Sequence, residues 1–368
     1  WWIEIAQGGT FISAVLLLFH QKWRTSVNRF TEAVTLFALV CAGLFPLIHM
    51  GRPQYAFFLA PYPSTLGMWP QFLSPLVWDF FAVSIYGSVS ILFWYMGIIP
   101  DLATLRDSTE RKYLRRLYSI MCFGWRNSAA HWHHYETTYK VIAALAAPLV
   151  ISVHSIVGLD FAYTIVPGWH STIFPPFFVV GAIFSGFAMV LTLLVPIRAI
   201  YKIEHLVTLN HIENMAKLLL TMGMFVLFGH LSEYFMAWYG GDLYEQYQAM
   251  HEAIGTYADA FYISMACTAL AIQPLWLARV RRSPVLLFFI SILVNVGMWA
   301  ERFLNIVGSL HHDYLPSSWH VYHTTFWDWS TFVGTIGLFL TLLFLFLRFF
   351  PLVSMAEVRG LIHRERKS

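Results

Sequence analysis

The sequence predicts an all-α integral membrane protein built from polytopic helix bundles. Of the 368 residues, 58% are hydrophobic and 12% are charged, whereas soluble domains carry about 25% charged residues. Continuous apolar runs of about membrane length recur along the whole chain. All but two of the 23 Lys and Arg fall in alternate connecting segments or in the tail, as the positive-inside rule requires of a multi-pass protein. A transmembrane barrel would show alternating strands of about ten residues instead.

Nine transmembrane helices are predicted in this chain. The apolar runs lie at roughly 1–20, 30–50, 75–99, 141–165, 177–200, 216–239, 256–278, 284–308 and 328–350. The chain opens at Trp1, inside an apolar run that lacks the basic start of a signal peptide. With the tail inside, nine spans leave Trp1 on the outer side, so we expect one upstream helix and ten spans in the full protein.

The direction of the spans follows from the basic segments. These lie near residues 22–29, 106–140, 198–217 and 279–282, and in the tail from residue 348. We therefore expect these loops and the C-terminus to be cytoplasmic. The expected organisation is a first helical bundle over 1–165, a second over 166–350, and a basic cytoplasmic tail over 351–368.

The long basic segment 100–140 allows two interpretations. Leu102, Leu105, Leu114, Leu117 and Met121 are spaced as in an amphipathic helix lying on the inner membrane surface. An ordinary basic loop explains the composition equally well.

Ionisable residues in the spans gather towards the outer side. Each costs roughly 2.5–3.5 kcal/mol on insertion scales, so each needs a reason. The inner half offers Glu32 and little else, whereas the outer half or rim carries seven acids, one histidine and both arginines that break the positive-inside pattern: Glu4, Asp79, Asp160, Glu233, Asp259, Glu301, Asp328, His49, Arg52 and Arg302. This asymmetry indicates chemistry at the outer face. The alternative is that the acids are solvated at span ends or pair with the two arginines, which we favour for Glu4, Asp259 and Asp328.

Asp160 lies well below the outer interface, and intramembrane acids of this kind are usually functional. His154 is six residues before it, about 9 Å deeper along the same helix and on another face, so the two are expected to line successive levels of a path. His230 and Glu233 are three residues apart and share a helix face. His230 fits a proton relay and a packing histidine equally well.

Glu301 and Arg302 are neighbours in the chain. They are expected to point to different sides of their helix, so that each pairs with a partner on another helix rather than with the other. Such interhelical contacts commonly hold transmembrane helices together.

The three cysteines, Cys41, Cys122 and Cys267, are far apart and form no CxxC or CxxCH motif. We therefore expect no iron–sulfur cluster, no covalently attached haem and no metal in this chain.

Two stretches carry a family resemblance. The letters HMGRP at residues 49–53 look like an H-x-G-R-P element, and a long run extends from Ser152 to Pro176 and on through residues 181–186. The chain resembles the NrfD/PsrC-like membrane subunits of quinone-linked oxidoreductases, and the long run is similar to the ActC subunit of alternative complex III.

The resemblance implies a quinol-binding subunit in the bacterial inner membrane that oxidises menaquinol near the periplasmic face. Electrons would pass to a periplasmic iron–sulfur subunit and on to haem c subunits, beside a paralogous ActF-like membrane subunit. Protons would be released or translocated, and the chain would hold no redox cofactor of its own. The implied quinol site comprises His49, Arg52, Asp79 and Asp160, with Asp160 as leading proton acceptor and His49 and Asp79 as its catalytic partners. The implied proton path comprises His154, His230, Glu233, Glu301 and Arg302.

Other classes remain open. A b-type haem protein needs paired axial histidines within the membrane, and His154 and His230 are on different helices. A secondary transporter would show inverted repeats and a site at the midplane, whereas the charges here gather outside it. A structural anchor explains the topology but not Asp160, and an ActF-like structural or proton-conducting subunit without quinol is a nearer alternative.

Overall fold

The computed structural model describes residues 1–49, 52–55, 75–312 and 315–359. Every regular element in these ranges is helical, which confirms the all-α prediction. The α-helices are α1 (Trp2–Leu18), α2 (Asn28–His49), α3 (Pro75–Ser108), α4 (Lys112–Met121), α5 (Ala129–Ala162), α6 (Phe174–Ile200), α7 (Leu209–Tyr239), α8 (Leu243–Ile254), α9 (Ala258–Met265), α10 (Ala278–Arg281), α11 (Pro284–Phe303), α12 (Ser309–His311) and α13 (Phe326–Phe349).

Seven helices in the described ranges are long and apolar enough to cross a membrane. They correspond to seven of the nine predicted spans, and the chain is a multi-pass membrane protein. The predicted span 1–20 is α1, an apolar helix of 17 residues. The predicted span 256–278 is divided into α9, a π-helical turn at Ala266–Leu270 and a 3-10 helix at Gln273–Trp276. Pro274 lacks the backbone N–H that a continuing helix would need. The total of nine spans stays a prediction.

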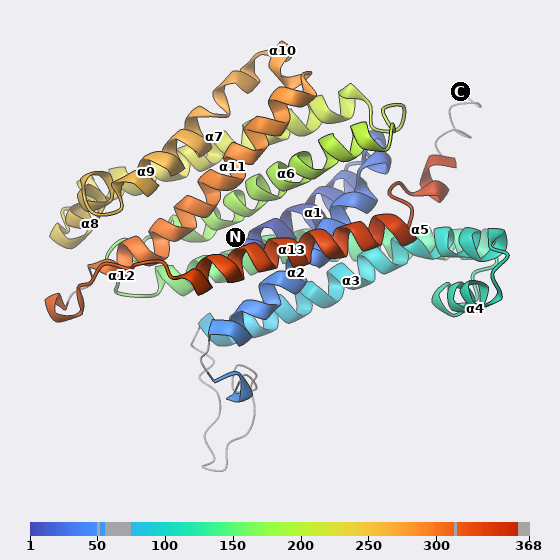
Figure 1. Cartoon of the computed structure of the whole chain (residues 1–368), viewed down its shortest axis with the longest axis horizontal. Helices are drawn as coiled ribbons and strands as arrows, with labels where there is room; N and C mark the ends of the chain where they lie inside the picture. The colour runs from blue at the N-terminus through green and yellow to red at the C-terminus, as the bar shows by residue number, and fades with distance from the viewer. Residues whose placement is uncertain (50–51, 56–74, 313–314, 360–368) are drawn as a thin grey trace.

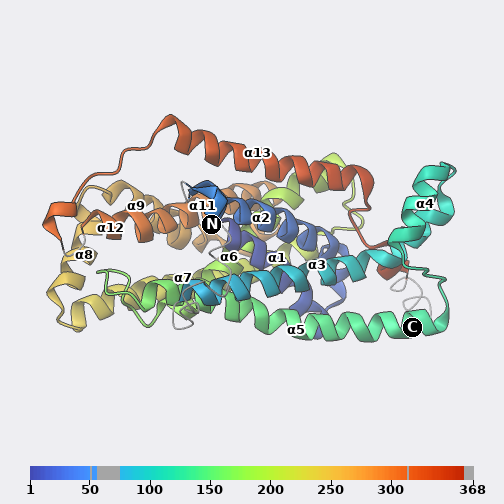
Figure 2. The ribbon, with the colours of Figure 1, turned by 90° about the horizontal axis from the view of Figure 1, so that it is seen from below.

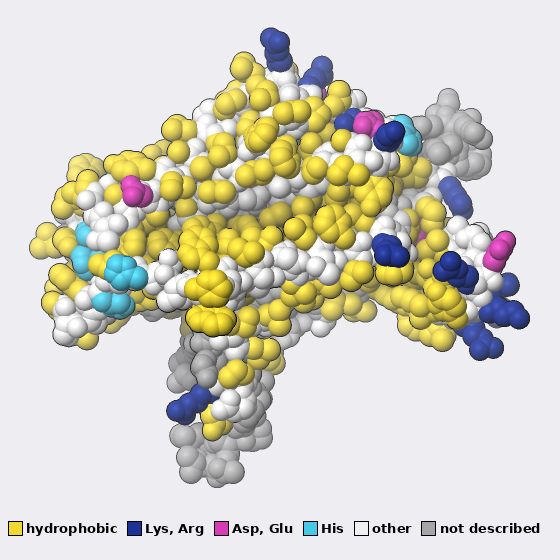
Figure 3. Space-filling model, viewed as in Figure 1, with side chains coloured by type: hydrophobic (Ala, Val, Ile, Leu, Met, Phe, Trp, Pro, Cys, Tyr) yellow, Lys and Arg dark blue, Asp and Glu magenta, His cyan; other side chains and the backbone are white. Residues whose placement is uncertain are grey.

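The long helices run roughly parallel to one another along the molecule (Figure 1). Figure 2 shows α13 on one face and α5 on the opposite face, with α1 and α6 between them. Lys and Arg side chains gather near α4 and α10, whereas histidines gather over α8 and α12 (Figure 3). We call the end of the bundle near α4 and α10 the basic end. It is formed by the segments that follow α1, α3, α6 and α9. We call the other the acidic end, where α1, α3, α6 and α13 begin.

The centre of the bundle is the contact between α1 and α6. A Cβ added at Gly8 or Gly186 would collide with the Cα of the other glycine. The two backbones therefore touch, as small residues allow between transmembrane helices. α6 is buried along most of its length and also packs against α5, α7 and α11. Since α6 contacts helices on both sides of residue 165, the division into two bundles stays a prediction.

The basic end is more ordered than a loop would be. The segment between α3 and α5 forms α4, which supports the amphipathic-helix interpretation for residues 112–121. Leu102, in contrast, is buried within α3. The tail turns back onto the bundle, because the backbone N–H groups of Met355 and Ala356 donate to Asp101, at 3.3 and 3.0 Å. Residues 360–368 lie outside the described ranges.

Candidate functional site

Two carboxyl groups meet at the acidic end of the bundle. Asp79 lies in the second turn of α3 and Asp160 in the last turn of α5, and their side chains lie close enough to share a hydrogen bond when one of them is protonated. Both residues are half-buried. Within the described part of the chain, one oxygen of each carboxyl group is buried without a hydrogen-bond partner. A bond between two carboxyl groups requires a shared proton, so this pair can hold and release protons.

Aromatic residues lie next to both acids in the chain. Trp78 and Tyr163 meet edge to face, with ring centroids 6.0 Å apart. Phe161, which follows Asp160 in the chain, packs on Trp169 and Phe178 with ring centroids 4.8 and 5.2 Å apart. A pair of proton-binding groups beside flat apolar surfaces is the combination that a ring-shaped substrate with hydroxyl groups requires.

The H-x-G-R-P element begins at the last residue of α2. His49 is the last residue of α2, and its side chain lies outside what the structure describes, as do Met50 and Gly51. Arg52 is exposed. The structure thus brings together Asp79 and Asp160, while the participation of His49 and Arg52 stays a prediction.

A second polar cluster is centred on Arg302 of α11. Its Nε lies 2.5 Å from a carboxylate oxygen of Glu4 on α1 and 3.1 Å from Glu301. The prediction that Glu301 and Arg302 do not pair is therefore wrong, since the two side chains lie within ion-pair distance of each other. The expectation of a partner on another helix is confirmed for Arg302. Glu4 is only 2% exposed, so it is not a solvated rim acid.

The Arg302 cluster is shielded from water. The guanidinium carbon lies 3.8 Å above the Phe178 ring, a cation–π contact. A Cβ at Gly181 would come within 3.0 Å of Nη2 of Arg302, so only glycine leaves full room for the guanidinium. Phe178 contacts both Arg302 and Phe161, and it therefore connects this cluster to the surroundings of Asp160.

A polar stripe on α1 escaped the sequence analysis. Glu4, Gln7, Thr10 and Ser13 recur every third residue and are all buried. Each contacts a different helix: Glu4 meets Arg302 on α11, Gln7 meets His154 on α5, Thr10 meets Ser90 on α3 and Ser13 meets Glu32 on α2. The regular spacing of four polar residues in an apolar helix was the available signal, since such residues must face protein rather than lipid.

The other proton-path candidates are His154, His230 and Glu233. His154 is fully buried against Gln7 and makes no hydrogen bond with Asp160 among the described residues, as its different helix face predicted. His230 is 4% exposed and meets the Phe177 ring edge to face at 5.0 Å. The charge of Glu233 interacts with Glu252, Glu301 and Arg302. Both His230 and Glu233 lie near enough to Arg302 for its charge to act on them.

Helix α8 follows α7 at the acidic end, near Glu233. Glu252 accepts hydrogen bonds from Tyr234 and Gln248, at 3.0 and 3.2 Å. Burial raises the pKa of Glu252 to about 7. Glu245 accepts a bond from the backbone N–H of Gly168, at 3.1 Å.

The basic end holds a buried ionic network that the sequence analysis missed. Arg29 lies 3.1 Å from Asp101, and Arg24 lies 2.9 Å from Glu357 and 3.8 Å from Glu32. The expectation that this half offers little besides Glu32 is wrong. The arginines were counted as loop charges, although both are at most 3% exposed. Beside this network, a cavity of about 630 Å³ is lined by Trp125, Trp132, Tyr135 and several charged side chains.

Comparison with known proteins is consistent with this architecture. Residues 2–312 match the family described as polysulphide reductase, NrfD. Over 192 residues, 51% of this chain, the sequence is 29% identical to a protein of Halobacterium salinarum described as a membrane subunit of dimethyl sulfoxide reductase. That match covers 39% of the relative, so the chain spans less than half of its length. The family match includes the carboxyl pair, the Arg302 cluster and the polar stripe of α1. The chain belongs to the polysulphide reductase NrfD family of membrane subunits.

Proposed function

We propose that this chain is the quinol-binding membrane subunit of a quinol-oxidising complex of the alternative complex III type. The observation that carries the proposal is the close approach of the Asp79 and Asp160 carboxyl groups. Oxidation of a quinol releases two protons and two electrons and therefore needs a proton acceptor beside an apolar slot. In this proposal the pair is the proton acceptor, and the aromatic residues next to it in the chain line the slot.

In the proposed reaction, menaquinol enters laterally from lipid between α1, α2, α3 and α5. A pair that holds one shared proton has one free carboxylate, and Asp160 uses it to take a proton from one quinol hydroxyl. His49 takes the second proton or orients that hydroxyl together with Asp79. Arg52 stabilises the developing negative charge on the quinol oxygen.

The two electrons leave through a partner, since the chain is expected to hold no redox cofactor of its own. We propose an iron–sulfur subunit docked at the acidic end, followed by haem c subunits, beside an ActF-like membrane subunit. In this arrangement the acidic end faces the periplasm of a bacterium and the basic end faces the cytoplasm, in accordance with the positive-inside rule. His154, His230, Glu233, Glu301 and Arg302 then carry protons away from the site.

The test is quinol oxidation by the assembled complex that carries Asp160→Asn. The amide preserves the shape of the side chain but cannot accept the proton, so turnover should fall by at least about 100-fold. Asp259→Asn is the matched control, since Asp259 is an acid near the same end of the bundle that lies outside the carboxyl pair. Near-normal turnover of an intact Asp160→Asn complex would remove Asp160 from the reaction.

A photoreactive quinone tests the location independently of turnover. We expect label on peptides from the outer ends of α3 and α5. Label confined to the walls of the 630 Å³ cavity would move the quinone site to the basic end.

One observation favours a second candidate, an ActF-like protein that conducts protons or supports the complex without binding quinol. The polar stripe of α1 connects side chains from the Arg302 cluster to Glu32, near the other side of the membrane. In that case Asp160→Asn would leave quinol oxidation intact, and Glu32→Gln would reduce proton movement. A secondary transporter is a third candidate, and it predicts transport of a solute by the isolated protein.

A further inference from the structure

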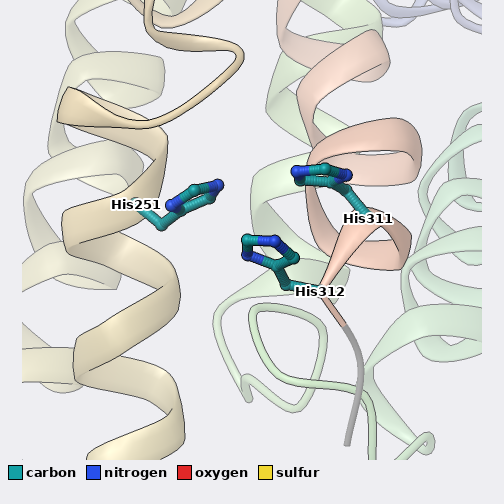
Figure 4. A group of neighbouring side chains, drawn as sticks. All are labelled: His251, His311 and His312. Atoms are coloured by element: carbon teal, nitrogen blue, oxygen red, sulfur yellow. The ribbon is translucent and has the colours of Figure 1, made fainter. Parts of the chain in front are cut away.

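Three histidines from distant parts of the chain meet at the acidic end. His251 lies on α8, and His311 and His312 lie at the end of α12, 60 residues later. Their ligand nitrogens all lie within 4.8 Å of one another. Figure 4 shows the His251 ring extending from its helix towards the other two. The ring centroid of His312 lies 4.1 Å from that of His311 and 4.3 Å from that of His251.

Hydrogen bonds leave each ring a nitrogen for a ligand. Nδ1 of His311 contacts the backbone carbonyl oxygen of His320. Metal-binding histidines typically donate their second nitrogen to such an oxygen, because this bond fixes the tautomer and the ring orientation. Nδ1 of His312 lies 3.4 Å from the hydroxyl of Tyr247. Nε2 of His251 is buried and has no hydrogen-bond partner in the described part of the chain.

We propose that His251, His311 and His312 bind one zinc-class divalent ion, with water as the fourth ligand. Three neutral imidazoles suit Zn²⁺, Cu²⁺ or Ni²⁺ better than Mg²⁺ or Ca²⁺, which prefer oxygen ligands. In a tetrahedral zinc site with Zn–N bonds of about 2.0–2.1 Å, ligand nitrogens are about 3.4 Å apart. Binding would require the rings to turn so that the three nitrogens, now within 4.8 Å of one another, converge to that spacing. This proposal replaces the expectation that the chain binds no metal, and it does not rest on the proposed quinol chemistry.

The ion would fasten α8 to the bundle. α8 follows α7 at the acidic end and is joined to the α5–α6 loop by the Glu245–Gly168 bond. A metal bridge from His251 to His311 and His312 would add a second connection, from α8 to the end of α12. The ion would therefore have a structural role: it would hold α8 in place beside the acids at the acidic end.

The alternative explanation is aromatic packing. Tyr247 stacks on His251 with centroids 5.7 Å apart, and Trp319 lies 4.4 Å from His312. Replacement of histidine by glutamine separates the two explanations, since glutamine retains much of the bulk but is a poor zinc ligand.

The experiment uses the complex purified with a histidine-free tag, stripped with a chelator and titrated with ZnCl₂ or CoCl₂. We expect one ion per chain and a visible Co²⁺ spectrum typical of tetrahedral coordination. The His251→Gln and His312→Gln variants should each bind zinc at least about 100-fold more weakly, since even second-shell changes cost 10–100-fold. Zinc should raise the Tm of the parent complex but not of these variants. His134→Gln, an exposed histidine on α5 at the basic end, is the matched control.

Two results would overturn the proposal. One is equal zinc binding by the parent and by the His251→Gln and His312→Gln variants, which would show that the ion binds elsewhere. The other is a folded, chelator-stripped complex that takes up neither metal, which would show that the three rings only pack. The metal content and Tm of folded variants decide the question without any assay of quinol oxidation.

Discussion

Buried acids at the two ends of the bundle have different partners. At the basic end, Asp101 lies 3.1 Å from Arg29, and Glu357 lies 2.9 Å from Arg24. At the acidic end, Asp79 and Asp160, which are half-buried, lie close to each other. The charge of an acid beside an arginine is neutralised by the partner, and the pair needs no proton. Two acids in contact need a shared proton, and a shared proton can be exchanged.

The Arg302 cluster lies between these two cases. One guanidinium faces two carboxylates, Glu4 and Glu301, and stands over an aromatic ring. Like the basic end, the Arg302 cluster contains ion pairs. Like the carboxyl pair, it contains more acidic groups than positive charges can neutralise. These contacts favour a stabilising role for the basic end, proton exchange at the carboxyl pair, and both roles for the Arg302 cluster.

The largest effect should come from Arg29→Gln at the basic end. Its guanidinium pairs with Asp101 and donates to the Gly97 carbonyl oxygen at 2.6 Å. Loss of one partner leaves a buried charge uncompensated, so the free energy of unfolding should fall by about 3–5 kcal/mol. Denaturant titration in mixed micelles measures this change. Turnover per folded complex should remain near the parent value.

Arg115→Gln is the control for that experiment. Arg115 is exposed on α4, and its loss should change the free energy of unfolding by less than about 0.5 kcal/mol. If Arg29→Gln folded normally but lost turnover, the basic end would belong to the reaction and the comparison would fail.

The second effect should come from Asp79→Asn at the acidic end. An amide can still hydrogen-bond to Asp160 but cannot take a proton, so quinol oxidation should fall by about 10–100-fold. The free energy of unfolding should change by less than about 1 kcal/mol, since no charge is left unpaired. Steady-state turnover and denaturant titration on the same preparation give both values. A variant that loses stability but keeps its turnover per folded complex would make the pair structural.

Hydropathy and charge were sufficient to predict the helical class and seven spans, because lipid demands long apolar helices. They were insufficient for α9 and the turns after it, where a π-helical turn and Pro274 interrupt an apolar run without changing its hydropathy. Residue position along the spans also predicted that Asp79 and Asp160 lie in the same half of the membrane. It did not predict that their carboxyl groups touch, which depends on how α3 packs against α5.

Pairing within the membrane was the hardest feature to predict from the sequence. Arg24 and Arg29 look like loop charges in the sequence, yet the structure buries both. Burial of a charged group depends on partners that are distant in sequence: Arg24 contacts Tyr139 and Glu357, and Arg29 contacts Asp101. For the same reason, three histidines from two segments could not be recognised as a cluster before the fold was known.

The third-largest effect should come from the contact between α1 and α6, in the region between the two ends. In Gly186→Ala, the new methyl group would collide with the Cα of Gly8 and push α1 away from α6. Overpacking of this kind should lower the free energy of unfolding by about 1–3 kcal/mol. Gly337→Ala on α13 is the control, since no atom lies within 4 Å of the added Cβ. Equal stability of the two variants would show that the backbones of α1 and α6 do not touch.

The smallest effect should come from Glu357→Gln, which tests whether the tail returns to the basic end. The Glu357 side chain is 18% exposed, and it accepts bonds from Arg24 at 2.9 Å and from Asn28 at 3.2 Å. Glutamine keeps an oxygen acceptor but removes the charge, so the free energy of unfolding should fall by about 1 kcal/mol. Glu136→Gln, at an exposed position on α5 beside the same cavity, should have an effect below about 0.5 kcal/mol. If the two changes were equal, the ion pair to the tail would contribute nothing, and the stability of the basic end would rest on Arg29 and Asp101.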